Sequence, residues 1–152
     1  MTKLTETHIE QLAIEELISL GYTYKLGPEI APDSEHPERK SYKDVLLNAR
    51  LLTAIQRINP SVPADAQNDA FKQIQRLNSP ELLANNEAFH RMLTEGINVS
   101  YQKNSSPRGD LVWLIDFKNP ENNEFLVVNQ FTVIENGNNK RPDIILFVNG
   151  IP

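Results

Sequence analysis

The sequence contains no cysteine, which excludes disulfides, thiolate zinc sites and cysteine nucleophiles from these 152 residues. It has no stretch near the roughly 20 apolar residues that span a bilayer, and its first residues form no apolar signal segment. Basic residues are not in excess: the net charge is -5, whereas a protein that coats nucleic acid non-specifically needs a strongly basic surface. We therefore expect a cytoplasmic protein without membrane attachment, and its acidity leaves room for a metal site built from carboxylates.

The sequence also lacks a G-x-x-x-x-G-K-[ST] loop, so nothing in it predicts ATP binding by a P-loop. It contains no internal repeat and no low-complexity tract. A length of 152 residues is that of one ordinary domain, and a hydrophobic content of 39% is sufficient for a core. We expect a single domain over residues 1–152.

Residues 1–96 carry the apolar spacing of helices, and residues 97–152 carry short β-rich runs separated by polar loops. A helical part followed by a strand meander predicts an α/β fold in which helices flank a mixed sheet. The predicted helices cover residues 6–20, 41–58, 63–77 and 79–96, and the predicted strands cover residues 97–102, 111–117, 124–134 and 143–148.

Capping signals support two of these helices. Ser41 with Asp44 three residues on has the pattern of a capping box at the start of the second predicted helix. Ser79 is a candidate N-cap of the fourth helix, with Pro80 in its first turn and Gly96 at its end.

The last predicted strand contains one ionisable residue, Asp143, near its start. Both faces of this strand are otherwise apolar, which predicts a central, buried strand. A carboxylate at its start costs free energy unless it is paired, hydrogen-bonded or bound to a metal. The alternatives are that Asp143 lies at the solvent-exposed mouth of the strand or accepts a hydrogen bond from a neighbouring loop.

The strand leads into Asn149-Gly150, a strong signal for a two-residue hairpin turn. Ile151 and Pro152 are then the first residues of a returning strand. Because nothing follows them, we expect the sequence to be a fragment that is truncated within a hairpin of its core.

Five separated stretches resemble, in the same order, the amino-terminal region of the R subunit of type I restriction-modification enzymes. They are "EQLAIEELISLGY", "VLLNARLLTAIQRINP", "NEAFHRMLTEGINVSY", "LIDFKNPENNEFLVVNQFTV" and "RPDIILFVNGIP". The resemblance implies an endonuclease domain of the PD-(D/E)xK group with a restriction-endonuclease-like α/β core. It implies cleavage of double-stranded DNA with Mg²⁺, in a complex with methyltransferase (M) and specificity (S) subunits. An ATP-driven motor follows this region in the family, so ATP is expected only there.

The resemblance also assigns candidate site residues. Asp143 in "RPD" corresponds to the metal-binding aspartate of the family, which continues beyond the hairpin turn into a strand with Glu-x-Lys. Since that strand lies past Pro152, we expect these 152 residues alone to be nearly inactive. Glu10 resembles a first-helix glutamate that approaches the metal in related nucleases. Alternatively, Glu10 and Thr7 form a capping box, in which Glu10 only satisfies the start of a helix.

Basic residues form two groups of candidate DNA contacts. Lys43, Arg50 and Arg57 recur every seven residues and would form one stripe on the second predicted helix, to bind phosphates or to pair with nearby acids. Lys140 and Arg141 are close to Asp143 in the sequence, where a cleaved phosphate would lie. Arg108 is the third basic residue of this second group.

Two polar residues of predicted strands, Asp116 and Gln130, could approach the site or make structural hydrogen bonds, and we do not count them as catalytic. The same features allow a second function class, a non-catalytic nuclease-like module that binds DNA or docks on a subunit.

Overall fold

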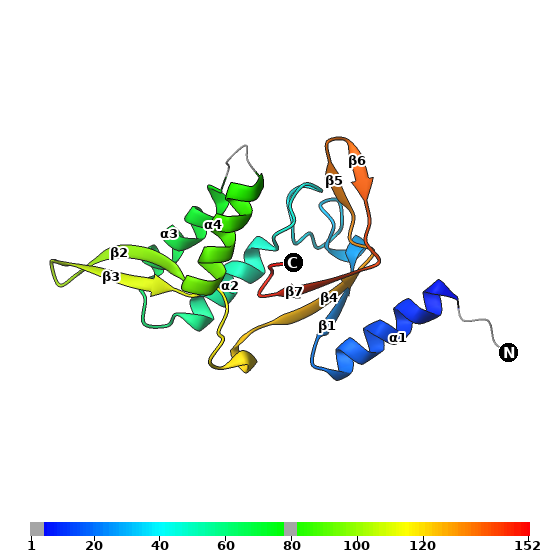
Figure 1. The fold of residues 1–152 in the computed structure, drawn as a ribbon, viewed down its shortest axis with the longest axis horizontal. Coiled ribbons are helices and arrows are strands. Elements are labelled where there is room, and N and C mark those ends of the chain that lie inside the picture. The colour runs from blue at the N-terminus through cyan, green and yellow to red at the C-terminus, as the bar shows by residue number, and fades with distance from the viewer. Residues whose placement is uncertain (1–4, 78–81) are drawn as a thin grey trace. The chain divides into compact units, whose positions relative to one another are not determined.

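The computed structural model describes residues 5–77 and 82–152 of the chain (Figure 1). The chain divides into two compact units, residues 1–50 with 124–152, and residues 51–123. This division does not test the expectation of a single domain, which stays a prediction. No helix within the described residues is long and apolar enough to cross a membrane.

The first unit contains a three-stranded mixed sheet in the order β1 (Thr23–Leu26), β4 (Phe125–Asn129) and β7 (Ile144–Val148) (Figure 1). The central strand β4 is parallel to β1 and antiparallel to β7. One face of the sheet forms a buried core, in which the rings of Phe131 and Phe147 meet edge to face at 5.3 Å. The other members of this core are Ile30, Leu47, Leu126 and Val128.

Helix α1 (Glu6–Ser19) contacts β1 and β4 in the same unit. Strand side chains alternate between the two faces of a sheet, so Val127 and Asn129 point away from the core that contains Leu126 and Val128. Asn129 accordingly reaches a side chain of α1. The sheet therefore lies between the buried core and α1, which carries one buried residue, Ile14.

Strand β1 was not predicted, and β7 lies at an edge of the described sheet. β1 lies just after the first predicted helix, where no strand was predicted, and three of its four residues are exposed, so no apolar alternation marks it. Among the described strands β7 is one of the two edges of the three-stranded sheet, and Leu146 on it is 40% exposed. A central place for β7, in a sheet with a further strand after the Asn149-Gly150 turn, stays a prediction.

The predicted turn at Asn149-Gly150 is confirmed. Val148 and Ile151 exchange both backbone hydrogen bonds at 2.9 Å, and both turn residues have positive φ, 55° and 79°. These angles are those of a type I′ turn, for which Asn-Gly is the preferred sequence.

Helix α2 (Asn48–Ile58) begins seven residues later than predicted. The Asp44 carboxylate accepts hydrogen bonds from the backbone N–H groups of Lys40 and Ser41, so the expected capping box closes a turn and not a helix. The N–H of Leu47 donates to the carbonyl of Gly150 at 2.9 Å, a distant contact that holds this segment outside the helix.

The second unit contains α3 (Ala64–Gln75), α4 (Leu82–Glu95) and the hairpin of β2 (Ile97–Lys103) with β3 (Ser106–Val112). The strand predicted over residues 97–102 is confirmed by β2. The prediction of a strand over residues 111–117 is wrong, because β3 ends at Val112. The expected cap residues Ser79 and Pro80 lie outside the described residues.

Smaller elements complete the chain. In the first unit η1 (Gly27–Ile30) follows β1, and β5 (Val133–Glu135) pairs with β6 (Asn138–Lys140). In the second unit η2 (Pro120–Asn122) lies in the loop that precedes β4. The long strand predicted over residues 124–134 is thus divided into β4 and β5.

Candidate active site at the end of the central strand

Glu10 of α1 points to the end of β4. Its Oε1 accepts hydrogen bonds from Gln130 Nε2 at 3.0 Å and from Asn129 Nδ2 at 3.3 Å. The helix is capped instead by Thr5, whose hydroxyl accepts from the backbone N–H of His8. The capping-box interpretation of Glu10 with Thr7 is therefore wrong, and Glu10 is engaged in a long-range contact with the sheet.

Gln130 links Glu10 to Asp143. It follows β4 directly, with a left-handed backbone at φ 58°, and was wrongly predicted to lie inside a strand. Its backbone N–H donates to the carbonyl of Asp143 at 3.1 Å, while its side chain holds Glu10. The structure thus brings Glu10 and Asp143 to one end of the sheet. The Asp143 residue is exposed and directly precedes β7, at the mouth of the strand.

Tyr24 on β1 extends this group of hydrogen bonds. Its hydroxyl donates to Asn129 Oδ1 at 2.8 Å. Burial is the main cause that raises the pKa of Tyr24 above its usual value, and the negative charges of Glu29 and Glu10 contribute further. The tyrosine therefore stays a neutral hydroxyl donor next to a negatively charged end of the sheet.

Gly27 and Arg39 surround the backbone of Gln130 and the residues after it. A Cβ atom at Gly27 would lie 2.2 Å from the Gln130 carbonyl oxygen, so only glycine allows this approach. The buried Arg39 donates to the carbonyl of Thr132 at 2.6 Å and stacks over the ring of Phe131 at 3.8 Å. Burial lowers the pKa of Arg39. Sequence reasoning missed both residues, because their partners are about 100 positions away.

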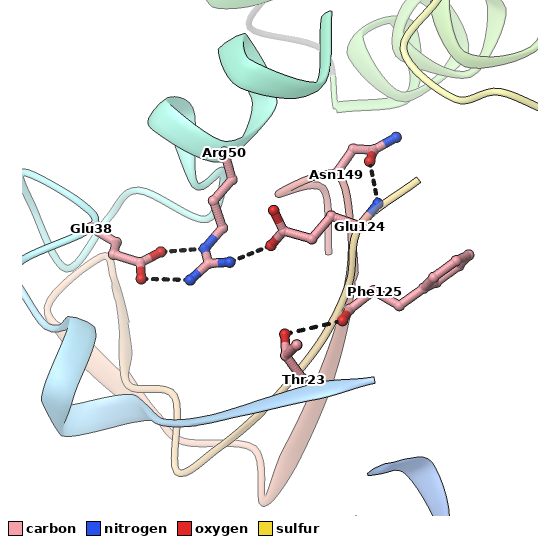
Figure 2. Close-up of polar contacts among 6 residues, drawn as sticks. All are labelled: Thr23, Glu38, Arg50, Glu124, Phe125 and Asn149. Carbon is pink, nitrogen blue, oxygen red and sulfur yellow. Dashed lines mark hydrogen bonds and ion pairs between the residues drawn. The ribbon is translucent and has the colours of Figure 1, made fainter. Parts of the chain in front are cut away.

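Arg50 lies in a separate ion-pair cluster with Glu38 and Glu124 (Figure 2). Its Nε and Nη2 donate to both oxygens of Glu38, the latter at 2.7 Å, and its Nη1 donates to Glu124. The hydrogen bonds to Glu38 are the main cause that raises the pKa of Arg50. Its donors are therefore occupied by carboxylates, which corresponds to the structural alternative for this residue.

The three spaced basic residues do not form one helical stripe. Lys43 is exposed but lies in the turn before α2. Arg57 is on α2 and donates from Nε to the carbonyl of Asn122 at 2.7 Å. The predicted stripe assumed that the helix starts at Ser41, and the later start at Asn48 removes Lys43 from it.

The other predicted basic residues are exposed. Lys140 pairs with Glu135 at 2.8 Å, and Arg141 is two residues before Asp143. Arg108 is on β3, in the second unit.

Asp116 has a structural role. Wrongly predicted to lie in a strand, it closes a turn by accepting from the backbone N–H groups of Lys118 and Asn119 and from the Asn122 amide. The Asn122 amide is the main cause that lowers the pKa of Asp116.

The side chains at the end of β4 suit a hard cation. Glu10 and Asp143 offer carboxylate oxygens, which Mg²⁺ prefers, and Mg²⁺ commonly uses only one or two carboxylates and keeps water or phosphate oxygens as its other ligands. Within residues 5–77 and 82–152, no group of three or more His, Cys, Asp or Glu side chains could hold a metal alone. Glu10 and Asp143 are therefore two candidate ligands, and a Mg²⁺ ion held by them would need substrate or water oxygens as its other ligands.

These observations define a mixed α/β protein with a candidate acidic site at one end of its sheet. Residues 3–152 match the family described as the type I restriction enzyme R protein N terminus. The chain therefore belongs to this family, and the resemblance noted in its sequence is confirmed.

Two relatives have similar sequences over almost the whole chain. A putative type I restriction enzyme MjaIXP endonuclease subunit of Methanocaldococcus jannaschii is 40% identical over 154 residues, which cover 99% of this chain and 15% of the relative. The type I restriction enzyme HindI endonuclease subunit of Haemophilus influenzae is 33% identical over 150 residues, which cover 98% of this chain and 14% of the relative. The chain thus spans about one seventh of the length of these relatives.

Proposed function

We propose that this chain carries the nuclease site of a type I restriction endonuclease subunit, which hydrolyses phosphodiester bonds of double-stranded DNA with Mg²⁺. The observation that carries the proposal is that Gln130 holds Glu10 with its side chain and Asp143 with its backbone. Family membership and the two endonuclease-subunit relatives support it. A restriction-endonuclease-like core is part of the same proposal, and the mixed sheet with α1 against it agrees with such a core.

In the proposed mechanism Glu10 and Asp143 would hold the metal through carboxylate oxygens. When bound, Mg²⁺ would supply Lewis-acid stabilisation of the charge that develops on the phosphate. Arg141 and Lys140 lie just before Asp143 in the sequence and would bind the phosphate next to the scissile bond. Exposure of Asp143 leaves its carboxylate open to a DNA strand.

The further DNA contacts and the partners are also proposals. Exposed Lys43 and Arg108 are candidates for phosphate contacts away from the scissile bond, ahead of Arg50 and Arg57, which have partners within the chain. The proposed assembly includes M and S subunits, and ATP would act only in a motor region of a complete R subunit.

The direct test is Mg²⁺-dependent cleavage of plasmid DNA by the complete gene product that carries these residues, together with its partner subunits. Asp143→Asn should lower the cleavage rate at least about 100-fold, as expected for loss of a group that stabilises transition-state charge. The control is Asp110→Asn, an exposed aspartate of the β2–β3 hairpin. Equal cleavage rates in wild type and Asp143→Asn would overturn the proposal.

One observation favours the alternative of a non-catalytic DNA-binding or docking module: the absence of a three-ligand metal group among the described residues. The alternative predicts that the wild-type complex binds DNA or a subunit but shows no metal-dependent cleavage. Asp143→Asn should then change neither the binding nor the absence of cleavage. The plasmid assay combined with a binding assay therefore separates the two functions.

A further inference from the structure

We infer that Gln130 is the positioning residue of this site, in that its side-chain amide sets the Glu10 carboxylate and its backbone N–H fixes the chain at Asp143. The inference rests on the proposed nuclease function. It gives a definite role to a residue that the sequence indicated only as one that could approach the site or make a structural hydrogen bond. Gln130 itself need not touch the metal or the DNA, because it would act through Glu10 and Asp143.

Two consecutive residues, Asn129 and Gln130, bind one oxygen atom of Glu10. In a strand the side chains of Asn129 and Gln130 would point to opposite faces of the sheet. Here both donate to Oε1 of Glu10. The left-handed backbone of Gln130, φ 58°, ends β4 and lets its side chain reach the face that Asn129 occupies.

A left-handed conformation is unfavourable for a residue with a Cβ atom, so it persists only where surrounding contacts hold it. The N–H of Gln130 is bound to the carbonyl of Asp143, and its carbonyl lies against Gly27, where no Cβ is tolerated. Two residues on, the carbonyl of Thr132 accepts from the buried Arg39. The conformation of Gln130 is thus fixed on both sides.

The side chains that hold Glu10 are uncharged amides. A carboxylate only accepts hydrogen bonds, so Asn129 and Gln130 must present their NH₂ groups to Glu10. The Tyr24 hydroxyl, which donates to Asn129 Oδ1, agrees with this orientation of Asn129. Both donors are neutral, so they orient Glu10 without cancelling its negative charge. A carboxylate held in this way keeps its attraction for a divalent cation.

The experiment measures Mn²⁺ binding to the complete gene product by electron paramagnetic resonance, without DNA. Gln130→Gly keeps the left-handed backbone accessible and removes the amide, whereas Gln130→Met keeps the side-chain length and removes the donor. The matched control is Asn136→Gly, another left-handed position at φ 50° in the exposed β5–β6 turn. Melting temperatures measured by circular dichroism identify any variant that fails to fold.

We expect the Mn²⁺ dissociation constant to rise about 10- to 100-fold in both Gln130 variants, the usual effect of removing a group that orients a metal ligand. Asn136→Gly should bind like wild type. Wild-type affinity in a folded Gln130→Gly protein would overturn the inference and leave the nuclease proposal intact. Absence of Mn²⁺ binding in wild type would overturn the inference, whereas the nuclease proposal is decided by the plasmid-cleavage assay, in which DNA is present to complete the site.

Discussion

Carboxylates are held at both ends of strand β4, but with different chemistry. At the start of the strand, Glu124 and Glu38 share the guanidinium of Arg50, and the Glu124 backbone N–H donates to Asn149 (Figure 2). At the other end, Glu10 accepts from the amides of Asn129 and Gln130. The first end uses a cation and the second uses neutral donors.

This difference separates a structural cluster from a candidate site. A guanidinium orients a carboxylate and also neutralises it, so a second cation gains little by binding there. Amide donors orient a carboxylate and leave its charge available. The same residue type therefore serves the stability of the fold at one end of β4 and a proposed metal site at the other.

The largest effect on stability is expected at the start of β4, where Arg50 pairs with two carboxylates. Arg50→Met would leave Glu38 and Glu124 half-buried without their partner, since these side chains are only 22% and 28% exposed. We expect the free energy of unfolding to fall by about 3 kcal/mol, near the lower limit for a fully buried pair. Urea denaturation measures this free energy of unfolding in wild type and variant. The control is Arg91→Met, which removes the exposed pair with Glu87 and should cost less than about 0.5 kcal/mol. Equal losses would remove the distinction between the two kinds of pair.

The next largest effect on stability is expected at the end of β4 where amides hold Glu10, and it acts through the backbone. Gly27→Ala would place a methyl group 2.2 Å from the Gln130 carbonyl oxygen, so the chain must shift there. We expect a loss of about 2 kcal/mol in urea denaturation, typical of overpacking. Gly109→Ala is the matched control, because the nearest atom to its Cβ is 3.9 Å away. A Gly27→Ala protein as stable as wild type would show that Gln130 is not held by this contact.

The elements that local patterns determine were predicted from the sequence. The helix at residues 6–20, the helix at residues 63–77 and the Asn149-Gly150 turn depend on neighbouring residues, and the structure contains all three. β1 was missed because Thr23 to Lys25 are exposed and their pairing partners in β4 lie about 100 residues away. The start of α2 was misplaced because a contact between Leu47 and Gly150 overrides the local capping signal.

The candidate site was predictable only in part, because it too depends on contacts between residues that are distant in the sequence. Family resemblance pointed to Asp143 and Glu10, which the structure places at one end of the sheet. Gln130 was noted but assigned to a strand, since nothing local signals that its backbone turns left-handed. That turn depends on Gly27 and Asp143, contacts that exist only in the folded chain.

Glu10→Gln tests whether charge matters at the amide end. The substituted amide can still accept from Asn129 and Gln130 through its oxygen, so the fold should keep its melting temperature. Loss of the negative charge should raise the Mg²⁺ concentration for half-maximal cleavage on the order of tenfold. Glu16→Gln, on the exposed side of α1, is the control and should leave it unchanged. A Glu10→Gln enzyme with wild-type Mg²⁺ dependence would make Glu10 a purely structural contact.

The smallest effect on stability is expected at the exposed pair of Lys140 with Glu135, because solvent screens both charges. The hydrogen bond from Lys140 is the main cause that lowers the pKa of Glu135. A lowered pKa stabilises the fold above the unfolded value and loses this contribution as the pH falls through the folded value. Melting temperatures of wild type and Lys140→Gln should therefore differ slightly at neutral pH and converge in acid.

The variant Lys140→Gln also tests whether Lys140 contacts DNA, independently of its effect on stability. If Lys140 contacts a phosphate, Lys140→Gln should reduce the slope of log affinity against log salt concentration by about 1. The slope is measured in the complete complex at neutral pH, with Arg91→Met as a control that also removes one exposed cation. A change of slope in Lys140→Gln alone would assign Lys140 to the DNA surface, because general loss of positive charge would affect both variants. Unchanged slopes in both would leave Lys140 with only its pairing to Glu135, and would move the proposed phosphate contact to Arg141.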